Sequence, residues 1–241
     1  MKDILDLHTH TIISGHAYNT LYEMIHSAAD KQLTLYGCSD HTPAMPGGPN
    51  QMYFVNFKVI PRTICGVNVL MGAELNLLKP DGSVDLKESL LKKLDYAIAS
   101  LHIPCTAPGT QEENTQAYLK VMENPYVQII GHPDDGRYPV DYQALVAAAK
   151  QHHKLLEVNN SSLRPNGARI NARENYVTML NLCREYEVSV IISSDAHVES
   201  DVGNHALAHG LLAELAFPQD LVVNTSLEKL LPYIPRVKEF L

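Results

Sequence analysis

Short apolar segments alternate with helix-like segments along the chain, and this alternation restricts the fold more than any other feature. Seven apolar segments have the length and composition of buried strands: 4–7, 33–39, 67–73, 96–101, 127–130, 155–158 and 188–193. Helical patterns occupy 20–32, 86–94, 111–123, 141–153 and 171–187, with a weaker one at 51–60 and a helical tail from about 204. Asp141 is expected to cap its helix. Strand–helix alternation predicts an α/β fold with a parallel sheet and right-handed crossovers.

Histidines and carboxylates follow most of these strands directly. His8 and His10 are two residues apart, so on an extended segment both imidazoles point to the same side, and a turn at Gly15 brings His16 beside them. The strand-end residues of this kind are His8, His10, His16, His41, Glu74, His102, His132, Asp195 and His197. They follow six strands, including the first and the last. A closed barrel brings all of these strand ends to one mouth, whereas an open sheet does not.

Imidazole and carboxylate side chains together are the ligands of Zn, Mn or Fe. A lone histidine after a strand is usually solvated or hydrogen-bonded, and a lone Asp195 could cap a helix. Nine such residues at six strand ends are hard to explain in this way. They exceed the ligands of one ion or of a pair, so we expect three ions, with Glu74 bridging two of them.

The bulk composition limits the partners of this chain. Its 19 basic and 27 acidic residues give a net charge of −8, which argues against long nucleic acids and anionic membrane surfaces as partners. No apolar run reaches the length of a membrane span. The cysteines are far apart and form no C-x-x-C pair, which indicates reduced thiols in a cytoplasmic protein: Cys38, Cys65, Cys105 and Cys183.

Residues that could contact a substrate are less distinct. Asn159 and Ser161 follow a strand at the same mouth and offer hydrogen-bond donors, although a polar helix-capping loop explains them equally well. Arg137 and Arg164 lie on loops after strand ends and could meet an anion, although a solvated surface arginine is the simpler interpretation. The loop at 42–50 is placed to gate the pocket.

Two further histidines outside this set could share a helix face. His205 and His209 are four residues apart, as in a metal-binding helix, but they lack the glutamate of an H-E-x-x-H motif. The remaining histidines lie within or at the ends of predicted helices, where a surface position explains them: His26, His152 and His153.

The strand-end motifs resemble those of the PHP (polymerase and histidinol phosphatase) family. They read Asp-Leu-His8-Thr-His10, Ser-Asp-His41, Gly-Ala-Glu74, Ser-Leu-His102, Gly-His132-Pro and Ser-Asp195-Ala-His197, and none of the nine positions departs from the pattern. The whole chain is most similar to the small stand-alone bacterial members, the YcdX-type phosphatases. This resemblance implies a single domain over 1–241 with a distorted seven-stranded (β/α)7 TIM-like barrel. It also implies a homo-oligomer, for which a trimer is the expectation.

The resemblance further implies three divalent ions, Zn²⁺ first and Mn²⁺ or Fe²⁺ as alternatives. One ion would be held by His8, His10, Glu74 and Asp195, the second by Glu74, His102 and His132, and the third by His16, His41 and His197.

The expected reaction is hydrolysis of a small phosphomonoester by in-line attack of a hydroxide that bridges two metals. Glu74 and Asp195 are the expected catalytic residues, with Asp195 also a candidate proton acceptor. Histidinol phosphate, or a short nucleic acid cut by a phosphodiesterase or 3′–5′ exonuclease, remains an alternative substrate. Amide hydrolysis would use similar metals. A non-catalytic metal-binding module is the alternative from a different class.

Overall fold

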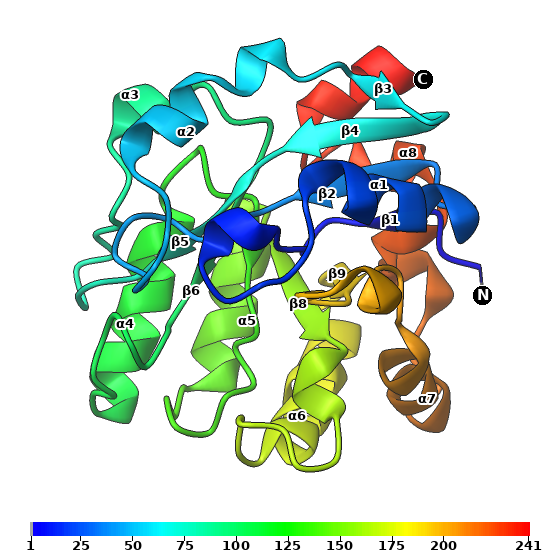
Figure 1. The fold of residues 1–241 in the computed structure, drawn as a ribbon. Helices are drawn as coiled ribbons and strands as arrows, with labels where there is room; N and C mark the ends of the chain where they lie inside the picture. The colour runs from blue at the N-terminus through cyan, green and yellow to red at the C-terminus, as the bar shows by residue number, and fades with distance from the viewer. Residues whose placement is uncertain (1) are drawn as a thin grey trace.

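Two mainly parallel sheets carry the fold of the computed structural model, which describes residues 2–241 (Figure 1). The first sheet has the order β1-β2-β4-β3, in which only β3 is antiparallel to its neighbour. Its strands are β1 (Leu5–Asp6), β2 (Leu35–Cys38), β3 (Thr63–Ile64) and β4 (Val67–Met71). The second sheet is parallel throughout, in chain order: β5 (Ala73–Asn76), β6 (Ala97–Ser100), β7 (Ile129–Ile130), β8 (Leu155–Asn159) and β9 (Val190–Ser193).

The two sheets are joined at two places, which makes the fold barrel-like. At the first, β4 passes into β5, an edge strand of the second sheet, through Gly72 alone. At the second, Thr9, which follows β1, forms a parallel bridge with Ala196, which follows β9. The His10 N–H also donates to the Ala196 carbonyl (2.8 Å). The first and last strands of the chain therefore end side by side.

Tyr96 fills the inside of the barrel at the joint between the sheets. Its hydroxyl donates to the Leu7 carbonyl (2.6 Å). A Cβ at Gly72 would lie 2.5 Å from the Tyr96 ring, and one at Gly37 would lie 2.4 Å from its hydroxyl oxygen. These are far inside van der Waals contact, so glycine at both positions makes room for the ring.

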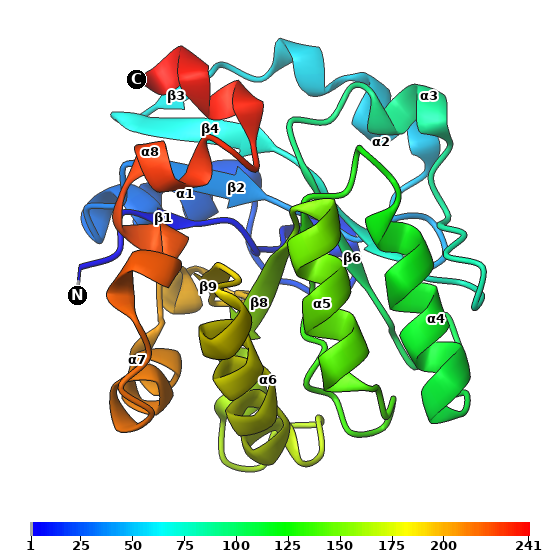
Figure 2. The same ribbon diagram turned by 180° about the vertical axis from the view of Figure 1, so that it is seen from behind.

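The helices cover the outside of the barrel. The longer ones are α1 (Leu21–Asp30), α4 (Gln111–Met122), α5 (Tyr142–His152), α6 (Ala172–Tyr186) and α7 (Ala206–Glu214), and the short ones are α2 (Gln51–Val55), α3 (Glu88–Leu91) and α8 (Leu227–Leu230). Helices α4, α5 and α6 stand side by side in both views (Figures 1 and 2). Their starts follow from local sequence: Thr110 forms a capping box with Glu113, and Asp141 caps α5.

A separate apolar cluster fills the barrel-like fold at the end where the strands begin. It combines inward-facing strand residues with residues of the C-terminal segment: Leu5, Leu7, Leu35, Leu70, Tyr96, Ile98, Ile129, Leu155, Ile191, Val223, Leu230, Ile234 and Val237. Because these side chains pack the interior, polar groups inside the barrel collect toward the carboxyl ends of the strands.

The expected elements are confirmed with small differences. Each expected strand is present, although the third is divided at Gly72 into β4 and β5, and β3 was not predicted. The helix expected at 51–60 consists of α2 and a 3-10 turn at Phe57–Val59, and the one at 86–94 shortens to α3. The cap by Asp141 is confirmed. Within residues 2–241 no helix is both long enough and apolar enough to cross a membrane.

Candidate metal centre

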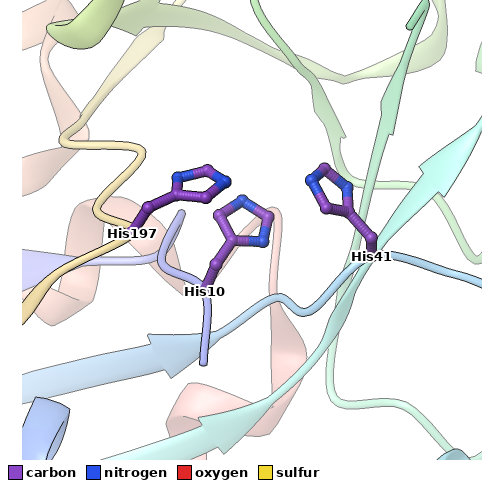
Figure 3. A group of neighbouring side chains, drawn as sticks. All are labelled: His10, His41 and His197. Atoms are coloured by element: carbon purple, nitrogen blue, oxygen red, sulfur yellow. The ribbon is translucent and has the colours of Figure 1, made fainter. Parts of the chain in front are cut away.

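The nine expected ligands converge above the carboxyl ends of the strands. The rings of His41 and His197 each lie with their centroids 4.3 Å from that of His10. His10 follows β1, His41 follows β2 and His197 follows β9, and in Figure 3 the three rings point toward one another. His16 approaches from its own turn, with its Nε2 3.0 Å from Nε2 of His197. Residues distant in sequence thus form one cluster.

Glu74 lies at the centre of this cluster and is 1% exposed. Its Oε1 is 2.9 Å from Nε2 of His132, 3.1 Å from Nε2 of His102 and 3.3 Å from Nε2 of His8. Its Oε2 is 2.8 Å from Nδ1 of His41 and 3.5 Å from Nε2 of His10. Each carboxylate oxygen thus faces a different group of imidazoles, which is the arrangement of a carboxylate shared between two ions.

Asp195 closes the other side of the cluster. Its Oδ1 is 3.3 Å from Nε2 of His10, 3.5 Å from Nδ1 of His197 and 3.6 Å from Nε2 of His8. The grouping by proximity differs in part from the sets implied by the family. His10 lies with His41 and His197 as well as with His8 and Glu74.

The donor atoms fit bound cations. Within residues 2–241, several buried atoms that face the cluster have no hydrogen-bond partner: His8 Nε2, His10 Nε2, His41 Nδ1 and Glu74 Oε2. Buried polar atoms are normally paired, and several nitrogen and oxygen atoms that face one another without a hydrogen bond of good geometry suit a cation between them. Imidazole nitrogen and carboxylate oxygen form the donor set of Zn²⁺ and related ions. The residues present therefore match a metal centre.

The electrostatics of the cluster differ from ligand to ligand. Burial lowers the pKa of His8, but the charges of Glu157, Glu74 and Asp195 outweigh burial and hold it well above its ordinary value. Other members are held in the deprotonated state that metal ligands need. Burial, with His197 and His41 nearby, holds the pKa of His10 well below its ordinary value, so its ring is neutral. Burial also lowers the pKa of His102. For Glu74 burial acts in the opposite direction, but the charges of His102, His8 and His41 outweigh it and hold its pKa well below the ordinary value.

A set of buried polar residues behind the ligands fixes their orientation. Glu157, on β8 and fully buried, lies 2.6 Å from Nδ1 of His8 and accepts the His132 backbone N–H (2.7 Å). Nδ1 of His102 lies 2.7 Å from Oδ1 of Asn76, and Nδ1 of His10 lies 3.1 Å from the Ser14 hydroxyl. Such contacts to the far ring nitrogen set the tautomer of a ligating histidine.

Our sequence analysis missed these supporting residues. Glu157 had a signal, because it is a charged residue inside an otherwise apolar predicted strand. Two of the expected ligands also have backbone conformations that their sequence did not predict. His132 has φ = 26° and Asp195 has φ = 55°, which non-glycine residues rarely adopt and which is common at functional sites.

The cluster opens into a cavity of about 480 Å³. Two arginines line it, Arg137 and Arg169. Arg169, which the sequence did not single out, donates from Nη2 to Asp195 Oδ2 (3.0 Å) and from Nη1 to Ser162 Oγ (2.9 Å). Asp135 fixes the Arg137 side chain through Nε (2.9 Å). The pocket therefore combines a cluster of metal-ligand type with two held guanidinium groups.

The candidate substrate residues lie in different places. Arg137 lines the cavity, whereas Arg164 pairs with Asp201 (2.8 Å) and is not part of the lining. Asn159 is buried, and its Nδ2 donates to Asp195 (3.1 Å), so it lies behind the site. Ser161 begins a 3-10 turn outside the lining. From the 42–50 loop, Met45 and Pro46 reach the cavity wall.

Residues 6–163 match the PHP domain model. The chain belongs to the PHP domain family. A probable phosphatase of Clostridium novyi (strain NT) is 45% identical over 234 residues, covering 97% of this chain and 95% of that protein. A probable phosphatase of Acetivibrio thermocellus is 40% identical over 239 residues, covering 99% and 98%. The chain thus groups with the probable phosphatases of this family, and the expected enzyme class is confirmed at that level.

Two solved structures share the fold at low sequence identity. One is histidinol phosphate phosphatase of Lactococcus lactis subsp. lactis, in complex with zinc, L-histidinol and phosphate. It has a TM-score of 0.64 and 17% identity, covering 90% of this chain and 95% of that one. The other is a chain of an archaeal ribonuclease P solved with mature tRNA, with a TM-score of 0.58 and 16% identity, covering 98% and 90%. Both support the α/β, barrel-like architecture.

Proposed function

We propose that this protein is a metal-dependent phosphatase of small phosphomonoesters. The observation that carries this proposal is the central position of Glu74, whose two carboxylate oxygens face five histidines at the floor of a cavity that also holds Arg137 and Arg169. We further propose that the two sheets form one closed, distorted seven-stranded barrel, with β4 and β5 counted as a single strand.

Three divalent ions, Zn²⁺ first, suit this ligand set. We assign one ion to His8, His10, Glu74 and Asp195, the second to Glu74, His102 and His132, and the third to His16, His41 and His197. The close approach of His10 to His41 and His197 makes His10 a shared neighbour of the first and third groups. When bound, the ions would activate a water molecule and offset charge on the phosphoryl group.

The protein's own residues bind and orient the substrate. Arg169 presents a guanidinium at the cavity wall while bonded to Asp195, so an incoming phosphate oxygen finds a positive group already held in place. Arg137, fixed by Asp135, offers a second such group in the cavity lining, and its side chain is more exposed than that of Arg169. Asp195 Oδ2 is occupied by Arg169 and Asn159, so Oδ1, which faces His8, His10 and His197, is the oxygen that would hold an ion or accept a proton.

Several observations favour a small substrate over a long nucleic acid. The cavity of about 480 Å³ has the size of a small-molecule site. The net charge of −8 disfavours a long phosphate backbone along the surface. Histidinol phosphate is a second candidate, since the L. lactis structure with the shared fold holds L-histidinol and phosphate. Short oligonucleotides remain a third.

The test measures metal content and turnover on one sample. Protein purified without chelator is analysed for metal per chain and assayed with a generic phosphomonoester, histidinol phosphate, a short oligonucleotide and an amide. At least three ions per chain with phosphomonoester hydrolysis supports the proposal. One ion or none, with no hydrolysis after reloading with Zn²⁺ or Mn²⁺, rejects it in favour of a non-catalytic module. Turnover of the amide alone points to the other hydrolase class.

A variant pair tests the role of Arg169. Arg169→Met should raise KM for the phosphomonoester at least tenfold, because a held cation facing the phosphate is lost. Arg173→Met is the matched control, since Arg173 is exposed and pairs with Glu214 on the surface (2.6 Å). Equal KM values for both variants would show that Arg169 does not contribute to substrate binding.

A further inference from the structure

A second group of metal-ligand type lies outside the pocket. It contains Asp3, from the segment that precedes β1, and His205 and His209, at the start and in the middle of α7. The two histidines are four residues apart, so the helix places them on one face. None of the three lines the pocket that holds the first cluster. The fold therefore brings the beginning of the chain and a late helix together through these side chains.

The distances within this group match those of the first cluster. Asp3 Oδ2 lies 2.6 Å from Nδ1 of His205 and 2.8 Å from Nε2 of His209. Glu74 approaches His41, His102 and His132 at 2.8–3.1 Å. In both places one carboxylate faces several imidazole nitrogens at short range.

This group also contains buried polar atoms that lack a hydrogen-bond partner. Within residues 2–241, Asp3 Oδ1 and His205 Nε2 are buried without a hydrogen-bond partner, and His205 is only 4% exposed. A tether of hydrogen bonds alone leaves both atoms unsatisfied, which is costly in a buried position. An ion held by His205 Nδ1 and both oxygens of Asp3 would account for Oδ1.

The buried carboxylate of Asp6 lies on the side of the His205 ring that faces away from Asp3. Asp6 Oδ1 is 3.7 Å from His205 Nε2, the nitrogen that points away from Asp3. Asp6 is fully buried and is itself fixed, because the Gly203 N–H donates to its Oδ2 (2.8 Å). Carboxylate, histidine and metal in this order form a common arrangement, in which the carboxylate orients the ring and raises its basicity.

From this geometry we infer that Asp3, His205 and His209 form a second metal site, which takes one divalent transition metal ion such as Zn²⁺. Two histidines and one carboxylate are an established ligand set for such ions. The His209 side chain is 29% exposed, so the site is reached from solvent and keeps a position for water. The bound ion joins α7 to the segment that leads into β1, and thereby fixes the start of the barrel against its last helices.

The experiment counts ions per chain in the full-length protein. Each protein is stripped with a chelator, reloaded with Zn²⁺, passed through a desalting column and analysed by mass spectrometry for metal. The key variant is His209→Gln, because a glutamine amide can still donate to Asp3 but is a poor zinc ligand. His209→Ala removes both functions. His26→Gln on α1 is the control, since His26 is an exposed helix histidine away from any cluster.

We expect both His209 variants to retain one ion fewer than the wild type and the His26→Gln control, with phosphomonoester kcat/KM unchanged. Equal metal content in all four proteins overturns the inference and leaves a hydrogen-bonded tether. Loss of more than one ion, together with loss of activity, also overturns it, because the site would then not be separate from the first cluster. The difference in metal count is readable even if no phosphatase activity is found.

Discussion

Glu157→Gln is the sharpest test of how the metal centre is built, because it changes the support of the ligands and none of the ligands themselves. Glu157 is fully buried on β8. Its Oε1 faces His8 Nδ1 at 2.6 Å, and its Oε2 accepts the His132 N–H at 2.7 Å. Burial alone would raise the pKa of Glu157, but the charge of His8 and its hydrogen bond lower it, so the carboxylate is ionised at neutral pH.

The expected free-energy cost of Glu157→Gln follows from the hydrogen bonds that Glu157 accepts. With His8 Nε2 facing the metal cluster, its Nδ1 carries the proton, so three donors point at Glu157: His8 Nδ1, the His132 N–H and Asn159 Nδ2 (3.2 Å). Glutamine keeps the shape but has one acceptor oxygen and one NH₂, so one buried donor loses its partner. That costs about 1–3 kcal/mol. Loss of an outer contact to a metal ligand typically weakens metal binding about 10–100-fold, or about 1.4–2.8 kcal/mol. Both routes give the same range.

The assay is a competition with a chromophoric chelator at fixed pH. We expect the midpoint for the most weakly held ion to shift about 10–100-fold in Glu157→Gln, while far-ultraviolet circular dichroism stays unchanged. Glu185→Gln is the control, because Glu185 is an exposed residue of α6. An unchanged midpoint in Glu157→Gln would refute the view that Glu157 holds His8 and His132 for metal binding.

Three further predictions concern the centre, the barrel and pH. Glu74→Gln should lower both metal content and phosphatase activity, and full activity would exclude a bridging role. Gly72→Ala should cost about 1–3 kcal/mol in urea unfolding, because its Cβ would lie 2.5 Å from the Tyr96 ring, whereas Gly210→Ala, with open space around it, should not destabilise. Burial lowers the pKa of Lys154 to about 8, so the unfolded chain binds more protons between pH 8 and about 10.4. Relative to Lys154→Met, wild-type stability should therefore rise across that window, by at most about 1.4 kcal/mol per pH unit in urea titrations; a flat or falling difference would contradict this.

The positions of the strand-end residues were predictable because one physical rule connects them. Parallel strands present their carboxyl ends on one side of the sheet. A sequence that places His8, His41, Glu74, His102 and Asp195 directly after different parallel strands therefore brings them together, whatever the details of the helices between. The structure places Glu74 at short distance from His8, His41 and His102, and His8 near Asp195.

The supporting residues were harder to predict because they depend on pairing across long sequence distances. Arg169 lies in a loop whose composition resembles that of any solvated turn, and only the fold brings it to Asp195, 26 residues away. Asp3 and His205 are 202 residues apart. Local patterns carry information about periodicity and chain ends. They do not encode which buried donor meets which acceptor.

The interior of the barrel nevertheless follows a two-residue period that the sequence contains. Inward-facing apolar residues near the amino ends of the strands form the lowest layer: Leu35, Leu70, Ile98, Ile129, Leu155 and Ile191. Two residues further along each strand, on the same side, stand small residues with one exception: Gly37, Gly72, Ser100, Gly131, Glu157 and Ser193. A Cβ at Gly131 would lie 2.1 Å from Ser100 Oγ, so this layer has little free room.

Glu157, the one large residue of this middle layer, contacts the residues that follow the strands. Two more residues along, four of these six strands lead to Glu74, His102, Asn159 and Asp195, and the other two lead to Ser39 and Pro133. The glycines leave space for the Tyr96 ring on one side of the middle layer. Glu157 reaches up from the other side to His8. Glu157 is paired in that position, because His8 Nδ1 lies 2.6 Å from its Oε1, and the His132 backbone N–H and Asn159 Nδ2 donate to its Oε2. With Nδ1 turned toward Glu157, His8 presents Nε2 toward Glu74 and Asp195, which is the orientation that a ligand of the proposed metal centre needs.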